Sequence, residues 1–222
     1  MSGKRDMPPA IWCIGRNYPE HAAEMGVDVT ERPTVFMKNP ASVIGDGDTI
    51  IIPPACDEHG PQVDFEGELA VVLGRSIRDA SVEEALDAVS GYAPANDVTA
   101  RWWQKQGSGG QWIRGKSFDT FCPIGATVPA VSVPDPQSLQ LVTRLNGEVM
   151  QESTTAVMLF PVGILLAELT RGTTLPAGTI LLTGTPAGVG SRRTPPRWLQ
   201  DGDVIEVEIE GVGLLRNPVQ HG

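Results

Sequence analysis

Two glutamates separated by one glycine, Glu66 and Glu68, are the acids in this 222-residue sequence whose spacing best suits chemistry. Side chains two residues apart on a β-strand share one face, with Cα atoms about 6–7 Å apart. Carboxylates at that spacing can converge on one cation, and oxygen-only ligation suits Mg²⁺, Mn²⁺ or Ca²⁺. The alternative is the solvated polar face of an edge strand, a common arrangement that needs no ion.

The residues around these acids favour a buried site. Gly67 is a poor strand residue and often marks a close approach of the backbone to another group. Residues 69–73 are wholly apolar, which indicates burial, and a buried acid needs a counter-ion. The same alternation places Asp64 on the face of Glu66 and Glu68.

Asp97 is the candidate for a third acidic ligand. It follows the apolar-leaning residues 91–96, and residues 99–104 then mix a cation, two tryptophans and an amide. That mixture is unusual for a plain turn and suits the wall of a pocket. The alternative is that Asp97 simply caps a turn.

His21 is the histidine whose neighbours favour chemistry. It lies three residues before Glu24, so on a short helix the two side chains share a face. A glutamate that accepts the imidazole N–H orients the ring and raises its basicity, so the pair can activate water or transfer a proton to and from carbon. The alternative is a surface pair of small energetic consequence. His59 lies in a loop-like segment, and we expect His221, next to the C-terminal residue, to be disordered.

These side chains must be positioned by a strand-rich scaffold. Alternating and apolar runs predict strands over residues 11–14, 35–38, 49–52, 63–73, 91–99, 139–145, 148–151, 179–183, 203–209 and 213–217. The pair Asn146-Gly147 predicts a hairpin with a type I′ turn. Regular helices do not separate the strands, which disfavours a doubly wound parallel sheet. We predict an α+β, β-rich fold with a mixed or antiparallel core.

Three short helices are predicted. The first covers residues 17–25, capped by Asn17 and ended by Gly26, and the second covers residues 81–89, with a capping box between Ser81 and Glu84. The third is the apolar stretch of residues 160–170, closed near Gly172.

Composition limits the class of protein. A net charge of −10 argues against nucleic acid as a partner, and no apolar run is long enough to cross a membrane. Cys13, Cys56 and Cys122 lack paired spacing, which indicates reduced, buried thiols. We expect one catalytic domain over residues 10–219 after a flexible N-terminus of residues 1–9. We expect a cytoplasmic location, or a mitochondrial one if a presequence has been removed.

Six motifs in register resemble the fumarylacetoacetate hydrolase superfamily over about residues 10–217. They are Gly15-Arg16-Asn17-Tyr18 with His21 and Glu24-Met25-Gly26, then residues 63–72, 95–101, 115–120, 145–148 and 182–190. The resemblance implies a mixed β-sandwich or roll with a few helices, and Mg²⁺ or Mn²⁺ held by Glu66, Glu68 and Asp97. It is closest to the short, single-domain branch, which lacks the N-terminal domain of the larger hydrolases and therefore their extra ligand. The stretch from Trp103 to Trp112 and the insert at residues 193–199 resemble the subgroup called fumarylacetoacetate hydrolase domain-containing protein 2.

The resemblance also implies roles for individual residues. His21 and Glu24 belong to a closing lid, Lys116 supplies charge beside a developing enolate, and Gln104 positions water or the enolate. Anchors for substrate carboxylates would be Arg16, Lys38, Arg101 and Thr185. Each cation has the alternative of a structural ion pair, and the loop around Thr185 has that of a simple turn. A homodimer is also implied.

Three functions are compatible with these residues. The first is an Mg²⁺- or Mn²⁺-dependent hydrolase that cleaves a C–C bond in an acylpyruvate-type 2,4-dioxo acid through a metal-stabilised enolate. The second is an oxaloacetate keto–enol tautomerase or decarboxylase that uses the same enolate, which the subgroup likeness favours. The third is an inactive metal-binding scaffold. Hydrolysis is our main expectation.

Overall fold

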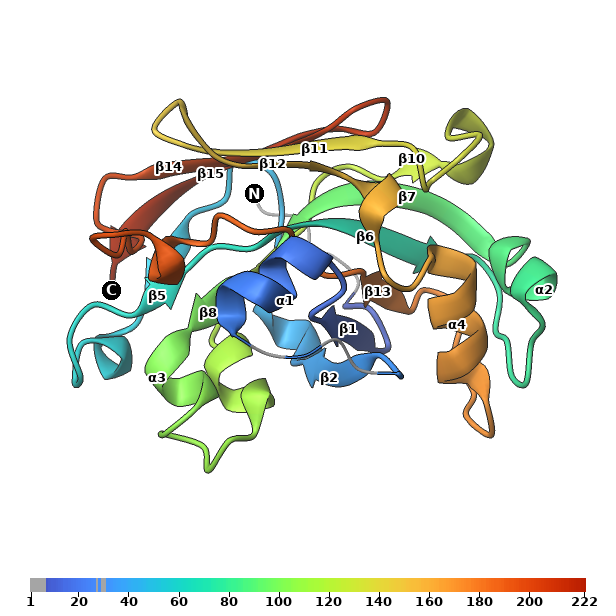
Figure 1. The fold of residues 1–222 in the computed structure, drawn as a ribbon, viewed down its shortest axis with the longest axis horizontal. Helices are drawn as coiled ribbons and strands as arrows, with labels where there is room; N and C mark the ends of the chain where they lie inside the picture. The colour runs from blue at the N-terminus through green and yellow to red at the C-terminus, as the bar shows by residue number, and fades with distance from the viewer. Residues whose placement is uncertain (1–6, 27, 29–30) are drawn as a thin grey trace.

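Two mixed sheets lie face to face in the computed structural model, which describes residues 7–26, 28 and 31–222 (Figure 1). The six-stranded sheet has the order β10 (Val128–Pro129), β7 (Val89–Asn96), β6 (Gly67–Leu73), β13 (Ile180–Leu182), β1 (Ile11–Gly15) and β2 (Thr34–Lys38). The five-stranded sheet has the order β12 (Glu148–Thr154), β11 (Gln140–Leu145), β14 (Val204–Ile209), β15 (Gly213–His221) and β4 (Ile50–Ile52). Two short pairs join β3 (Val43–Ile44) to β9 (Cys122–Pro123) and β5 (Val63–Asp64) to β8 (Thr99–Ala100). The expected β-rich α+β fold is confirmed.

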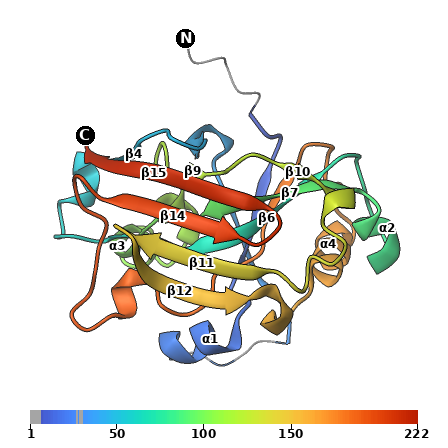
Figure 2. The same cartoon turned by 90° about the horizontal axis from the view of Figure 1, so that it is seen from above.

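In the part of the chain that the structure describes, four short α-helices surround the sheets. They are α1 (Pro19–Met25), α2 (Val82–Leu86), α3 (Arg101–Gln104) and α4 (Val162–Thr170). The 3₁₀ turns are η1 (Pro40–Ser42), η2 (Pro54–Cys56), η3 (Trp112–Lys116), η4 (Ala130–Ser132), η5 (Thr155–Val157) and η6 (Gly190–Arg192). Helices α2 and α4 lie together at one end of the sandwich and α3 at the other (Figures 1 and 2). Among the described residues, no helix has the length and apolar character needed to span a bilayer.

The main core fills the space between the two sheets. Leu69 and Val71 of β6 face Leu141 of β11 and Val207 of β14 in one cluster of buried side chains. Along β14 the odd-numbered residues are buried and the even-numbered ones are more exposed, as the alternation predicts. Side chains of β6 thus pack tightly in this core; the strand carries Glu68, and Glu66 lies directly before it.

The turn chemistry of the hairpin between β11 and β12 is confirmed. Asn146 and Gly147 both have positive φ, at 53° and 83°, as a type I′ turn requires. The capping box of α2 is also present, with Ser81 and Glu84 bonding each other's backbone N–H. That helix ends at Leu86, earlier than predicted, because β7 begins at Val89. Helix α4 begins at Val162, two residues later than predicted.

The predicted single strand over residues 63–73 is wrong. The chain forms β5 and β6 with a break at residues 65–66. At the break, the Glu66 N–H donates to the Asn96 side-chain oxygen at 3.0 Å, where a continuous strand would bond to a backbone carbonyl. The break includes Glu66 itself and leaves Asp64 in β5 and Glu68 in β6, so the three acids do not lie on one continuous strand.

Two further expectations are corrected. Asn17 does not cap α1; its buried side chain bonds the N–H and C=O of Phe160 and the C=O of Thr183, and the helix starts at Pro19. His221 is not disordered, because it pairs with Ile52 at the end of β15. The three cysteines are buried and free, as expected. Of the N-terminus expected to be flexible, residues 1–6 lie outside the described residues.

Candidate metal centre and active site

Glu66, Glu68 and Asp97 form a buried cluster in which one oxygen from each lies within 4.8 Å of the others. Antiparallel pairing of β6 with β7 creates the cluster, because it sets Glu68 opposite Ala95. Just beyond the paired residues, the Asp97 N–H donates to the Glu66 C=O at 2.8 Å. The strand argument anticipated two of these acids on one face, and the sheet register supplies the third.

Gly67 lets this cluster sit directly under the five-stranded sheet. A Cβ at this position would lie 2.0 Å from the Thr143 Oγ1 atom of β11. The Gly67 N–H donates to the Gln151 side-chain oxygen at 3.0 Å, and its C=O accepts from the Thr185 hydroxyl at 2.9 Å. The close approach predicted for this glycine is therefore confirmed, and only a residue without a side chain fits.

Three buried cations compensate most of the negative charge. Lys116 Nζ lies 2.7 Å from Glu66 and 2.6 Å from Asp97, and Lys38 Nζ lies 2.6 Å from the other oxygen of Asp97. Arg101 Nη2 lies 2.8 Å from Glu66. Burial alone would raise the pKa of Glu66, but the charges of Lys116 and Arg101 outweigh it and lower that pKa to about 2. Glu66 is therefore an anion throughout the physiological range.

Glu68 is the acid of the cluster that lacks a cation. Among the described residues no lysine or arginine forms an ion pair with it, and its one hydrogen-bond donor is the Gly184 N–H at 2.7 Å. Burial, followed by the charges of Asp97 and Glu66, raises the pKa of Glu68 well above its ordinary value. Ionised Glu68 is therefore costly to bury unless more positive charge is present. A divalent cation held by all three acids would supply that charge.

Lys116 contributes charge but has no spare hydrogen-bond donor. Its three N–H groups reach Glu66, Asp97 and the Thr99 hydroxyl, at 2.6–2.8 Å. Burial would lower the pKa of Lys116, yet the neighbouring Asp97 and Glu66 carboxylates hold it above the ordinary lysine value. The side chain therefore stays protonated and is excluded as a general base.

The His21–Glu24 pair forms as predicted on helix α1, which packs against the loop that follows β13. His21 Nδ1 is 3.2 Å from one oxygen of Glu24, and the other oxygen accepts the Gly188 N–H at 3.1 Å. Gly26 ends the helix with a left-handed φ of 67°, and Arg192 donates to the Met25 C=O at 3.4 Å. His21 is consequently buried, with Nε2 as the ring nitrogen left for proton transfer.

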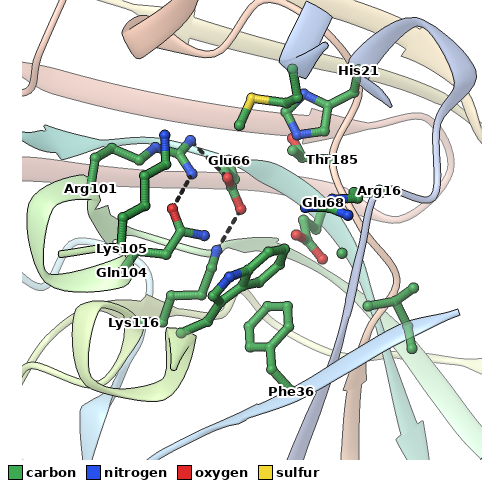
Figure 3. Close-up of a pocket in the computed structure, with 14 residues that line it drawn as sticks. Arg16, His21, Phe36, Glu66, Glu68, Arg101, Gln104, Lys105, Lys116 and Thr185 are labelled. Atoms are coloured by element: carbon green, nitrogen blue, oxygen red, sulfur yellow. Dashed lines mark hydrogen bonds and ion pairs between the residues drawn. The ribbon is translucent and has the colours of Figure 1, made fainter. Parts of the chain in front are cut away.

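A cavity of about 160 Å³ brings these groups together (Figure 3). Glu66, Glu68, His21, Gln104 and Lys116 all line it. An aromatic wall of Phe36 and Trp112, with ring centroids 5.3 Å apart, closes one side. Its size is similar to that of the ~150 Å³ cavity that accommodates benzene, so a small acid fits and a bulky one does not.

Three of the four predicted anchors line the cavity, but their side chains differ in freedom. Arg16 has a positive φ of 61° and holds its guanidinium 5.5 Å from the Trp112 ring. Arg101 is committed to Asp64 and Glu66. The Thr185 hydroxyl is occupied by two hydrogen bonds, one donated by the Gln151 amide and one made to the Gly67 C=O.

The fourth predicted anchor, Lys38, is corrected by the structure. Lys38 does not line the cavity and is a structural ion-pair partner of Asp97.

Gln104 has one end of its amide fixed. Its oxygen accepts from Arg101 at 3.2 Å, which leaves the NH₂ group directed toward the cavity (Figure 3). This arrangement fits the predicted role of an amide that donates to a substrate oxygen or to water.

Sequence reasoning missed two charged residues of the site, besides the aromatic wall of Phe36 and Trp112. Asp64 was placed on the face of the metal acids but given no role; it binds Arg101 and accepts the N–H groups of Gly190 and Ser191. Lys105 lines the cavity and was not singled out. Its position directly after Gln104 was the available signal.

Known proteins with similar sequences share most of this chain. Residues 10–220 match the family model described as fumarylacetoacetate (FAA) hydrolase C-terminal. The chain is 44% identical over 213 residues to a mitochondrial oxaloacetate tautomerase of Xenopus laevis, which covers 96% of this chain and 66% of that protein. It is 45% identical over 212 residues to an oxaloacetate tautomerase of Bacillus subtilis (strain 168), covering 94% and 69%. The chain thus spans about two thirds of the length of these curated relatives.

Solved structures share the architecture as well. A fumarylacetoacetate hydrolase of Exiguobacterium antarcticum superposes with a TM-score of 0.86 at 44% identity, covering 97% of this chain and 76% of the other. A 5-carboxymethyl-2-hydroxymuconate delta-isomerase of Mycobacterium smegmatis gives 0.84 at 38% identity, covering 97% and 80%. Proteins named for hydrolysis and for isomerisation therefore share this scaffold.

Proposed function

The chain belongs to the fumarylacetoacetate hydrolase family, and from that premise we propose that it is a divalent-metal-dependent oxaloacetate keto–enol tautomerase. Our main sequence-based expectation was hydrolysis of an acylpyruvate. Relatives at 44% and 45% identity are named oxaloacetate tautomerases, which favours the alternative. Hydrolysis becomes the second candidate, supported by the name of the Exiguobacterium neighbour.

One observation carries the proposal. The three-acid cluster and the His21–Glu24 pair contribute to one small cavity, so a cation site and a proton-transfer group face the same bound molecule. Keto–enol exchange of a 2-oxo acid needs these two things: stabilisation of the enolate oxygen and a group that moves a proton at the adjacent carbon.

Glu66, Glu68 and Asp97 would hold Mg²⁺ or Mn²⁺, whose chemistry when bound is Lewis-acid polarisation of the substrate keto group. In the ketonisation direction the enol loses its O–H proton and gains a proton at C3, so the molecular formula is unchanged. Glu24 accepts the His21 Nδ1–H, which fixes the tautomer whose Nε2 can take up and return a proton. His21 is thus assigned the transfer at C3.

The remaining side chains assist without exchanging protons. Gln104 donates its NH₂ to the oxygen on which negative charge develops, and Lys116 places a permanent positive charge beside it. Phe36, Trp112 and helix α1 limit the access of water, and this favours proton transfer over hydrolytic attack.

The experiment is to mix Mg²⁺-loaded protein with oxaloacetate and, separately, with acetylpyruvate. Enzyme-dependent loss of enol absorbance without pyruvate release supports tautomerisation. Pyruvate from acetylpyruvate would replace the proposal with hydrolysis, and pyruvate with CO₂ from oxaloacetate would replace it with decarboxylation. A protein that binds Mn²⁺ but transforms neither compound would agree with the inactive scaffold.

We also propose a homodimer and retain the cytoplasmic or mitochondrial location as a prediction. Light scattering should give a mass near twice the 23.7 kDa of one chain. A mass equal to that of one chain would contradict the dimer.

A further inference from the structure

We propose that Lys105 determines specificity by binding the second carboxylate of a dicarboxylate 2-oxo acid. The inference rests on the proposed function, because it assumes that the first carboxylate and the keto group lie at the three-acid cluster. It adds a residue, and a requirement on the substrate, that the cluster and the His21–Glu24 pair do not themselves impose.

The cavity-lining cations divide into two groups. Arg101 and Lys116 form ion pairs with buried acids at 2.6–2.8 Å and have their charge compensated. Within the described part of the chain, Arg16 and Lys105 line the cavity without an ion pair to any carboxylate. Lys105 is exposed and Arg16 is partly exposed, so a second carboxylate that meets either of them is only partly desolvated. It still gains from one of these two cations, because desolvation without a partner is costly.

The electrostatic surroundings favour Lys105 over Arg16. Figure 3 shows Arg16 on the side of the cavity where Glu68 lies, and Lys105 on the opposite side with Arg101 and Gln104. Burial lowers the pKa of Lys105 most, Arg101 and Arg192 lower it further, and Asp64 opposes them in part, so the positive charges near Lys105 outweigh the negative one. Arg192 donates hydrogen bonds to the Met25 sulfur and to the Met25 C=O. Neither acceptor carries a negative charge, so these contacts do not neutralise the guanidinium. An anion bound at Lys105 relieves this repulsion.

The backbone around Lys105 is well fixed for this purpose. Its N–H donates to the Trp102 C=O at 3.1 Å, and its C=O accepts the Gly110 N–H at 2.7 Å. Gly107 packs so closely that an added Cβ would lie 2.3 Å from the Trp102 ring. The loop over residues 105–110 is therefore closed on itself, and the lysine extends from a defined position at the end of α3.

The test compares two substrates that differ in the second carboxylate. Oxaloacetate and 2-oxobutanoate both exchange C3 hydrogens through an enol, but 2-oxobutanoate has a methyl group where oxaloacetate has the carboxylate. Mg²⁺-loaded Lys105→Ala should raise KM for oxaloacetate about 5- to 20-fold, the loss of one charge-assisted hydrogen bond, with kcat little changed. Deuterium exchange into 2-oxobutanoate, followed by NMR and corrected for the uncatalysed rate, should be unaltered.

Two variants serve as controls. Lys105→Arg should keep most of the oxaloacetate preference, and Gln106→Ala, an exposed neighbour that does not line the cavity, should behave as the unmodified protein. An unchanged KM for oxaloacetate in Lys105→Ala, or equal changes for both substrates, would overturn the inference.

A binding measurement separates failure of this inference from failure of the proposed function. If the unmodified protein enolises neither compound, the tautomerase proposal fails. Calorimetric affinities of the Mg²⁺-loaded protein for the two acids still test Lys105. Loss of the preference for oxaloacetate in Lys105→Ala supports its role, and an unaltered preference refutes it.

Discussion

Glu24 joins helix α1 to the loop after β13 through the Gly188 backbone N–H, which donates to one carboxylate oxygen at 3.1 Å. Its other oxygen holds His21 Nδ1 at 3.2 Å. One carboxylate therefore both docks the helix over the cavity and sets the tautomer of the histidine that we assign to proton transfer.

Replacing Glu24 by glutamine should separate these two roles. The amide oxygen still accepts the Gly188 N–H, but the NH₂ group donates to Nδ1 and leaves the proton on Nε2, the wrong tautomer for a base. We expect kcat for enol loss to fall roughly 10²- to 10⁴-fold, by analogy with the aspartate-to-asparagine change in the serine protease triad. Glu20→Gln on the same helix is the matched control, because Glu20 is exposed. A Glu24→Gln protein with normal kcat would remove the pair from the mechanism.

Glu68→Gln should abolish tight metal binding while leaving the fold intact. The amide keeps the hydrogen bond from the Gly184 N–H and replaces a buried carboxyl that has no cation partner among the described residues. Mn²⁺ affinity, measured by electron paramagnetic resonance, should fall at least about 100-fold, since one of three charged ligands is lost. Without metal the variant should melt no lower than the parent. Unchanged Mn²⁺ affinity would contradict the assignment of Glu68 as a ligand.

Metal affinity should rise with pH through the range in which Glu68 titrates. Burial and the charges of Asp97 and Glu66 raise the pKa of Glu68 in the metal-free protein, so its proton must leave when a cation binds. The effect on stability has the opposite sign: because the folded-state pKa is raised, the contribution of Glu68 to metal-free stability is fully present below the unfolded pKa of about 4.3 and is lost as pH rises through the folded value. Calorimetry in buffers of different ionisation enthalpy should detect proton release. Glu66, whose pKa is lowered to about 2, should release none above pH 4.

Gly67→Ala should destabilise the protein through a clash between the two sheets. The new methyl would lie 2.0 Å from Thr143 Oγ1, and overpacking of this kind costs about 1–3 kcal/mol. We expect a lower midpoint in urea unfolding. Thr143→Ala removes the contacting hydroxyl, so in a double-mutant cycle it should recover part of the loss. Strictly additive effects would show that the two sites are not in contact.

Local patterns determined much of this protein in advance. The alternation in β14, the turn residues Asn146 and Gly147, and the capping box of α2 are short-range features, and each formed as predicted. The spacing of His21 and Glu24 is also local, because it depends only on helix geometry. Identification of the family rested on motifs distributed along the whole chain.

The tertiary structure decided which partner each polar side chain takes. Asn17 and Lys38 have types that suit a cap and a substrate anchor, yet long-range packing gives Asn17 to Phe160 and Lys38 to Asp97. The lowered pKa of Lys105 and the raised pKa of Glu68 likewise depend in part on residues far away in the sequence. Burial and Coulomb energies fall off with distance in space, so they become known only when the two sheets bring distant segments together.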